Sequence, residues 1–197
     1  QESKNTTEIV DAVNKLISDC TFNKVDTKKI AMFDAEYIFL QIRCKSVGSK
    51  VDLKITCPDD KETQVPISID LDDINVAMFE EHTNEVQLTP EIKIVFKYPQ
   101  LDSFTKYTSA SDTSKMVFEL TADCIEEVHF KEEITHKVDM SKKDLDEFIE
   151  SLSTEQFTRL VKFFETMPRL RHRVEVTNPK TEVTSEVMLE GIQSFLV

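Results

Sequence analysis

Five stretches of this chain repeat apolar residues at the three- and four-residue spacing that is typical of one helix face. This spacing predicts helices over about residues 6–20, 33–47, 101–128, 141–152 and 153–167. Gly48 directly follows the second helix, at the position where a residue with left-handed backbone commonly ends a helix. Ser141 and Asp144 form a capping signature for the fourth helix. Pro168 limits the fifth helix, because the residue before a proline disfavours helical backbone.

Two other stretches alternate apolar and polar residues, which predicts two β-hairpins. Their strands cover about residues 51–57 with 65–69, and 174–176 with 183–189. The turns between them hold Pro58 and Pro179, which are expected to fix the turn backbone. The runs Ile55-Thr56-Cys57-Pro58 and Val176-Thr177-Asn178-Pro179 occupy equivalent positions, which is a short internal echo. Further strands are expected near residues 86–88 and 92–96, and residues 128–140 fit either short strands or a loop.

These elements predict an α+β protein in which helices are interleaved with two antiparallel hairpins in a single compact unit. Along the chain they form an N-terminal helical part (1–48), a strand part (49–98), a second helical part (99–168) and a C-terminal hairpin with an apolar tail (169–197). Only two glycines are present, so no glycine-rich nucleotide loop, phosphate loop or hydrolase turn exists. Gly48 and Gly191 are each expected to mark a positive φ or close packing.

Charge is concentrated in the middle of the chain, although the net charge of the whole is −13. Residues 51–150 hold 10 basic and 24 acidic groups, whereas the two flanking segments are nearly balanced. This excess argues against nucleic acid and anionic membranes as partners. No apolar run approaches the roughly 20 residues that a membrane-spanning helix needs. Two interpretations of the acidic middle stay open: a solubilising surface and a surface for a basic partner.

No group of residues has the spacing of a catalytic or metal site, so no catalytic residue, metal ligand or cofactor is expected. His129 and His136 straddle Glu132 and Glu133, and on a helix the imidazoles would share a face with a carboxylate. Surface histidines are the simpler interpretation, and acidic doublets such as Asp59-Asp60 are interpreted as solvated charge. The four cysteines form no C-x-x-C pair and are expected to be reduced thiols: Cys20, Cys44, Cys57 and Cys124.

Three segments are candidates for docking a partner protein: the helix over 154–166, the basic cluster that follows it, and the apolar tail. The alternative for both the helix and the tail is packing into the core. The basic cluster would bind either an acidic partner or the chain's own acidic middle. The candidate residues are Phe157, Val161, Phe164, Arg169, Arg171, Arg173, Ile192, Phe195 and Leu196.

Three motifs occur in a fixed order along the chain. Residues 33–48 follow the pattern FD-x-EY-x-FL-x-IR-x-KSVG, residues 163–172 read FFETMPRLRH, and residues 189–195 follow LEG-x-x-x-F. Together they resemble the T4-type phage base plate protein family, and their order and spacing agree over most of the chain from about residue 8. Residues 122–125 add a weaker match.

The resemblance implies a role in building the baseplate hub of a contractile tail, without enzyme activity. It also implies zinc-ribbon-like hairpins, because many members carry Cys-x-x-Cys pairs at both turns, and a segment before Gln1. This chain keeps only Cys57, with Asp60, Asn178 and Thr181 at the other three positions. The hairpins are therefore expected to be degenerate ribbons that hold their turns without zinc.

Two functional hypotheses follow from the resemblance. The first is a non-enzymatic structural protein of the hub, made late in infection, that docks other hub or tail proteins within a symmetric assembly. The second is a transient chaperone of hub subunits that is absent from the mature virion. Both place the protein in the host bacterial cytoplasm during assembly, and the first also places it in the tail baseplate. A cytosolic enzyme that uses the histidines and carboxylates is a third hypothesis, from another class. One chain does not specify the hub partner, the copy number or the symmetry.

Overall fold

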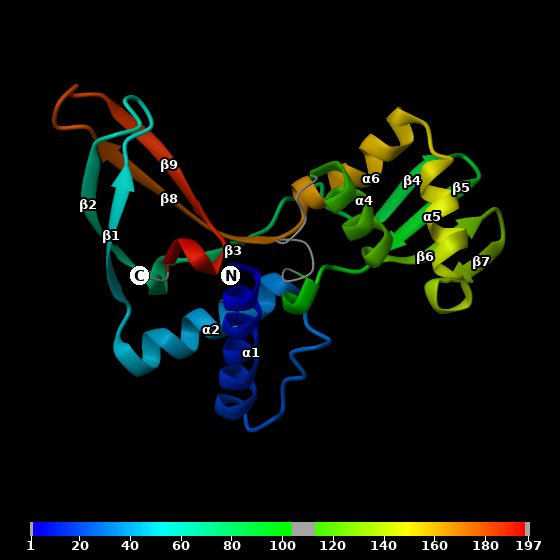
Figure 1. Ribbon diagram of the computed structural model, residues 1–197, viewed down its shortest axis with the longest axis horizontal. Helices are drawn as coiled ribbons and strands as arrows, with labels where there is room; N and C mark the ends of the chain where they lie inside the picture. The colour runs from blue at the N-terminus through cyan, green and yellow to red at the C-terminus, as the bar shows by residue number, and fades with distance from the viewer. Residues whose placement is uncertain (1, 104–112, 196–197) are drawn as a thin grey trace. The chain divides into compact units, whose positions relative to one another are not determined.

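The computed structural model describes residues 2–103 and 113–195, and the chain divides into two compact units (Figure 1). The hairpin unit comprises residues 13–77 and 168–197, and the sheet–helix unit comprises residues 1–12 and 78–167. Each unit has its own hydrophobic core. The α+β class is therefore confirmed, but the expectation of a single compact unit is wrong. Both units combine segments that are distant in sequence. The division into four consecutive parts stays a prediction.

The hairpin unit is built around two antiparallel hairpins. Strand β1 (Lys50–Thr56) pairs with β2 (Gln64–Asp70), and β8 (Arg169–Thr177) pairs with β9 (Thr184–Glu190). A short strand β3 (Asn75–Ala77) pairs with the start of β8, so the second sheet has the order β3-β8-β9. Both predicted hairpins are confirmed. Strand β8 begins earlier than the sequence pattern predicts because β3 pairs with its first residues.

Helices complete the hairpin unit. Helix α1 (Glu2–Cys20) begins in the sheet–helix unit and continues into the hairpin unit, and α2 (Met32–Val47) follows it. Two 3₁₀ turns, η1 (Leu71–Asp73) and η3 (Ile192–Phe195), follow β2 and β9. Helix α1 ends at Cys20 as predicted. Val10, Val13 and Ile17 are buried, whereas Ile9 and Leu16 are exposed.

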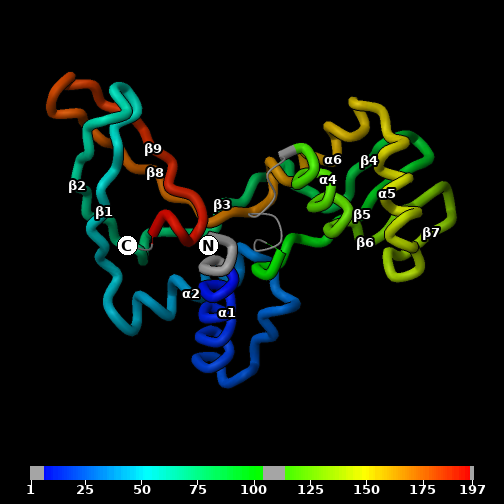
Figure 2. Tube along the Cα trace, in the orientation of Figure 1, coloured from blue at the N-terminus to red at the C-terminus, as the bar shows by residue number. Residues whose placement is uncertain are grey.

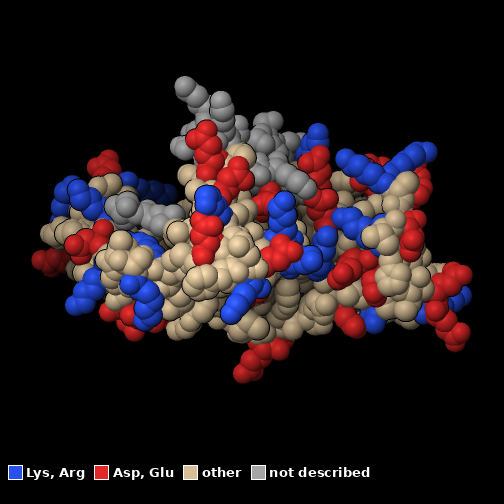
Figure 3. All heavy atoms as spheres, turned by 90° about the horizontal axis from the view of Figure 1, so that it is seen from below, with Lys and Arg blue, Asp and Glu red and all other residues tan. Residues whose placement is uncertain are grey.

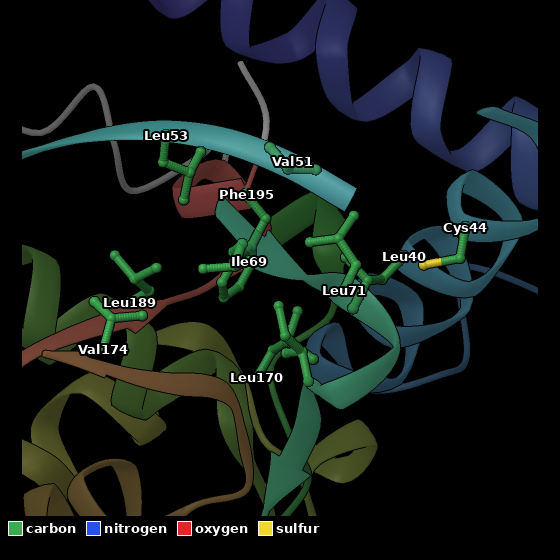
Figure 4. Packing of buried hydrophobic residues seen from close by; sticks show 11 residues of the cluster. Leu40, Cys44, Val51, Leu53, Ile69, Leu71, Leu170, Val174, Leu189 and Phe195 are labelled. Atoms are coloured by element: carbon green, nitrogen blue, oxygen red, sulfur yellow. The ribbon is translucent and has the colours of Figure 1, made fainter. Parts of the chain in front are cut away.

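The core of the hairpin unit joins α2, both hairpins and the C-terminal turn (Figure 4). Leu40 from α2 and Ile69 from β2 meet Leu170 from β8 in this cluster. Phe195 of η3 is fully buried among these side chains. The remaining labelled members of the cluster are Cys44, Val51, Leu53, Leu71, Val174 and Leu189.

The sheet–helix unit contains a four-stranded antiparallel sheet of order β4-β5-β6-β7 (Figure 2). The strands are β4 (Glu85–Thr89), β5 (Ile92–Phe96), β6 (Ile125–Phe130) and β7 (Glu133–His136). The core packs one face of this sheet against α4 (Thr113–Cys124), α5 (Lys142–Glu150) and α6 (Thr154–Thr166). Ile94 and Phe96 point to that face, with Phe96 stacked on Phe163 of α6 at a ring-centroid distance of 4.6 Å.

The predicted C-terminal end of the helix over 101–128 is wrong. Helix α4 ends at Cys124, and β6 begins at Ile125, because residues 125–130 pair with β5 through a ladder whose register shifts near Ile125. Residues 104–112 of the predicted helix lie outside the described residues. The segment 128–140, which the sequence left open, contains the end of β6, β7 and the 3₁₀ turn η2 (Lys137–Asp139).

Local signals at helix ends are largely confirmed. The Ser141 hydroxyl accepts the Asp144 N–H at 3.1 Å, and the Asp144 carboxylate accepts the Ser141 N–H, which is a complete capping box. Gly48 has a positive φ of 99°, as expected. Its ψ of 159° is extended, however, so the predicted left-handed helical cap is wrong, and the residue occupies a region that is essentially restricted to glycine.

Candidate functional site

The two hairpin turns share one backbone geometry. In the first turn the Lys61 N–H donates to the Cys57 carbonyl at 2.9 Å, and in the second the Glu182 N–H donates to the Asn178 carbonyl at 2.9 Å. Lys61 and Glu182, the fifth residues of these turns, both have positive φ, at 57° and 60°. The short internal echo in the sequence is therefore also an echo in backbone structure. Pro58 and Pro179 occupy the same position in the two turns, directly after the first residue.

Side chains join the two turns, which lie side by side at the hairpin tips (Figure 1). The Asp59 carboxylate accepts two hydrogen bonds from the Asn178 side-chain nitrogen, at 3.1 and 3.0 Å, and one from the Thr181 hydroxyl. The Asn178 side-chain oxygen accepts the Lys180 N–H at 2.9 Å. Asn178 is fully buried, so water cannot bond its side-chain amide. Both polar atoms of the amide have protein partners instead. We name Asp59, Asn178 and Thr181 the hairpin clasp.

Hydrogen bonds hold the clasp carboxylate in its charged form. Donation from Thr181, and then from Asn178, lowers the pKa of Asp59 below its ordinary value. The neighbouring Asp60 closes its own turn by accepting the N–H and hydroxyl groups of Thr63 and the N–H of Glu62, which lowers its pKa as well. Asp59 is exposed and Asp60 is partly buried, which agrees with their interpretation as solvated charge, but both carboxylates also accept hydrogen bonds that order the turns.

The residues at the four zinc-ribbon positions do not fit a zinc ion. The Asp60 carboxylate is engaged by Thr63, while the Asn178 nitrogen and the Thr181 hydroxyl donate to Asp59. Of the four positions, only the one held by Cys57 carries a thiol, the ligand that structural zinc sites prefer. Within residues 2–103 and 113–195, no three histidine, cysteine or acidic side chains are grouped for metal binding. A carboxylate–amide contact therefore joins the turns at this place.

A second buried polar group holds the C-terminal turn. Glu36 of α2 is 4% exposed, and one of its carboxylate oxygens accepts the Ile192 N–H at 3.1 Å. Burial, assisted by the nearby Glu190, raises the pKa of Glu36 to about 7, although the Ile192 hydrogen bond and Arg169 lower it. Gly191 has a φ of 71°, and a Cβ there would lie 3.4 Å from the same oxygen. The expectation that Gly191 marks a positive φ or close packing is confirmed by its φ.

The predicted basic cluster is paired along the second hairpin. Arg169 and Arg171 of β8 both bind Glu190 of β9, with 3.0 Å from the Arg171 nitrogen to the carboxylate. Arg173 lies 3.4 Å from Glu186 and is mostly exposed. These acidic partners belong to β9 and lie outside the acidic middle of the chain. The pairing strengthens the β8–β9 ladder through cross-strand charge contacts.

The apolar docking candidates lie largely inside the two cores. Phe157 and Val161 of α6 are partly buried, and Phe164 is buried in the core of the sheet–helix unit. Ile192 and Phe195 are buried in the hairpin unit, and Leu196 lies outside the described residues. In this conformation the buried members expose little surface to a partner. The role of all nine candidates in partner binding stays a prediction.

The histidine pair occupies strands and not a helix. The His129 ring nitrogen lies 2.7 Å from one oxygen of Glu127, and the His136 ring nitrogen lies 3.2 Å from the other. The helical arrangement considered from sequence is wrong, because the segment forms the β6–β7 hairpin. The contacts with His129 and His136 lower the pKa of Glu127, so this carboxylate is charged beside both rings.

Sequence reasoning missed Asp59 and Glu36. Asp59 meets Asn178 across 119 residues, and no local pattern reports a contact of that separation. Glu36 lies inside the FD-x-EY motif, and its position on the otherwise apolar face of α2 was the available signal. A carboxylate on a buried helix face requires a hydrogen-bond partner.

The fold and the clasp together define an α+β protein in which two antiparallel hairpins are joined at their turns by side-chain hydrogen bonds. The model of the T4 bacteriophage base plate protein family matches residues 1–197, and the chain belongs to this family. Membership indicates a structural role in a phage baseplate, with other tail or baseplate proteins as partners. No curated protein and no solved structure matches the chain. Among the described helices, none combines the length and apolar character needed to cross a membrane.

Proposed function

We propose that this chain is a non-enzymatic structural component of the baseplate hub in a contractile phage tail. The observation that carries the proposal is the family match over residues 1–197. The hairpin clasp and the buried Glu36 contact support it, because a protein that positions neighbours needs surfaces of fixed shape. Co-purification of the tagged chain from infected cells tests the proposal. Recovery of hub and tail proteins supports it, and recovery of none of them contradicts it.

Docking is proposed to use the nine candidate residues on α6, β8 and the C-terminal tail. Arg173 is exposed on β8, and Phe157 and Val161 are partly exposed on α6. The buried Phe164, Ile192 and Phe195 would support these surfaces from within the cores. Pro168 lies between α6 and β8, so it would fix the change from helix to strand next to the basic cluster.

The second candidate is a transient chaperone of hub subunits, and the distribution of charge favours it. The sheet–helix unit holds 11 basic and 22 acidic groups, a net charge of −11, whereas the hairpin unit holds 13 and 15, a net charge of −2. An acidic unit suits a client with a basic surface. On the face drawn in Figure 3, acidic side chains lie among basic ones, so the excess is spread out there. Mass spectrometry of mature particles and of assembly intermediates distinguishes the two candidates.

We further infer that the two hairpins are a metal-free relative of the zinc ribbon. Their turns have equivalent backbone hydrogen bonds, and Asn178 and Thr181, at the second pair of Cys-x-x-Cys positions, belong to the clasp. The hydrogen bonds of the clasp would then join the two turns, as a zinc ion does in a zinc ribbon. The test is thermal unfolding with and without a chelator, combined with the Asn178 variant described in the Discussion.

A further inference from the structure

We propose that the outer edge of β7 binds an extended, basic segment of a partner protein by strand addition. The inference rests on the proposed docking function and names a surface and a partner chemistry for it. Strand addition uses the backbone groups of a sheet edge for affinity and the alternating side chains for specificity.

The β7 edge is open, while the opposite edge of the same sheet is covered. Strand β7 pairs only with β6 among the described residues, and all of its side chains are exposed. At the other edge, the Arg159 guanidinium of α6 donates to the Leu88 carbonyl of β4 at 3.2 Å. An unpaired row of N–H and C=O groups is a template for another strand.

The register of the β6–β7 hairpin shows which backbone groups point outward. Phe130 pairs with Glu133 across a two-residue turn, so these two residues exchange backbone hydrogen bonds. Because such pairs alternate along the ladder, Val128 and Thr135 also bond each other. Ile134 and His136 occupy the alternate positions, so their backbone groups face away from β6. They are the two residues that would bond an added strand.

Exposed apolar side chains accompany this edge. Phe130 is 46% exposed, Ile134 is 54% exposed and Val138 of η2 is 91% exposed. Lys137 fixes η2 by donating to the carbonyl oxygens of Ala122 and Asp123 at 2.9 and 2.7 Å. Val138 is therefore held in an ordered position next to the edge.

Charge indicates a basic occupant. Among the described residues, the side chains of Glu132, Glu133 and Asp139 have no hydrogen-bonding or ion-pair partner, and all three residues are exposed. The neighbouring cations are engaged, since Lys131 lies 3.3 Å from Glu91 and Lys137 binds α4. A segment that alternates lysine or arginine with apolar residues would place a cation beside Glu133 and an apolar group beside Ile134. A second copy of this chain fits less well, because it would bring another unit of net charge −11 to the edge.

The test uses the full chain, labelled with ¹⁵N, and a short peptide that alternates lysine and valine. The matched control peptide carries proline in place of each valine, which keeps the charge and removes the ability to form a strand. The proposal predicts shifts of the amide signals of residues 133–137 and slower hydrogen exchange at Ile134 and His136 with the first peptide only. Glu133→Lys should weaken its affinity about tenfold, because attraction becomes repulsion. Glu165→Lys, an exposed reversal on α6, should change the affinity by less than about twofold at physiological salt.

Three results would each overturn the proposal: equal affinity for the two peptides, shifts that map away from β7, or a concentration-dependent dimer of the chain through β7. The first indicates charge attraction alone, and the third identifies a second copy as the occupant. These outcomes concern only the edge, whereas the proposed function fails when hub and tail proteins do not co-purify with the chain.

Discussion

Asn178 is the residue on which most of the contact between the hairpin turns depends. Its amide nitrogen donates to both oxygens of Asp59, and its amide oxygen accepts the Lys180 N–H. It occupies the position equivalent to Cys57, and both side chains are buried. A buried amide with every polar atom paired specifies a unique arrangement, because any other arrangement leaves polar groups unsatisfied.

Replacing Asn178 should destabilise the hairpin unit without any effect of metal. Asn178→Ala is expected to lower the free energy of unfolding by about 1–3 kcal/mol, because the buried hydrogen bonds of the clasp are lost. The measurement is chemical denaturation with and without excess EDTA. The same exchange at the exposed Asn75 serves as control and should cost less than about 1 kcal/mol. A melting temperature that EDTA lowers in the unmodified protein would contradict the metal-free clasp.

Glu36 makes stability depend on pH at the residue scale. Its folded pKa of about 7 lies above the ordinary value of 4.5, so the folded state favours the protonated carboxyl. Its contribution is fully present below about pH 4.5 and is lost as the pH rises through about 7. The unmodified protein should therefore lose stability between pH 4.5 and pH 8, whereas Glu36→Gln should not. The free energy of unfolding of Glu36→Gln, relative to that of the unmodified protein, should rise by about 3 kcal/mol over this range.

Denaturation curves at several pH values measure this effect. Glu175→Gln, an exposed exchange on β8, is the matched control and should leave the pH dependence unchanged. If Glu36→Gln and the unmodified protein lose stability in parallel between pH 4.5 and 8, then Glu36 does not carry the effect.

At the scale of elements, Gly48 determines how α2 gives way to β1. Its backbone combines a φ of 99° with a ψ of 159°, and a Cβ there would meet no atom within 4 Å. Gly48→Ala should cost about 1–3 kcal/mol through backbone strain alone. Thermal unfolding measures the cost, with Ser46→Ala in the last turn of α2 as a control that should stay within about 0.5 kcal/mol. An unchanged melting temperature would show that this backbone relaxes freely.

Local patterns predicted the elements better than they predicted the contacts between them. The alternation from Val51 to Cys57, followed by a proline turn, identified the first hairpin because period two and turn chemistry are both local. Ile125 and Val128 were assigned to a helix, because their three-residue spacing is helical, and only the pairing with β5 shows that they form a strand. The clasp could not be predicted, because Asp59 and Asn178 come together only after both hairpins have formed.

At the scale of the whole molecule, two units with separate cores carry different tasks in this account. The hairpin unit is nearly neutral and holds its turns by the clasp, and the sheet–helix unit is acidic and has an open sheet edge. Membership in the T4 bacteriophage base plate protein family connects both units to one structural role in the baseplate. The hub is the part of the baseplate in which we propose that this role is performed.

Quantitative mass spectrometry of purified virions tests the central claim most directly, with phage that lack the gene for this chain as the blank. We expect the chain in mature particles in a constant ratio to the other baseplate proteins. Its presence in assembly intermediates together with its absence from mature particles would contradict the claim that it is a structural component.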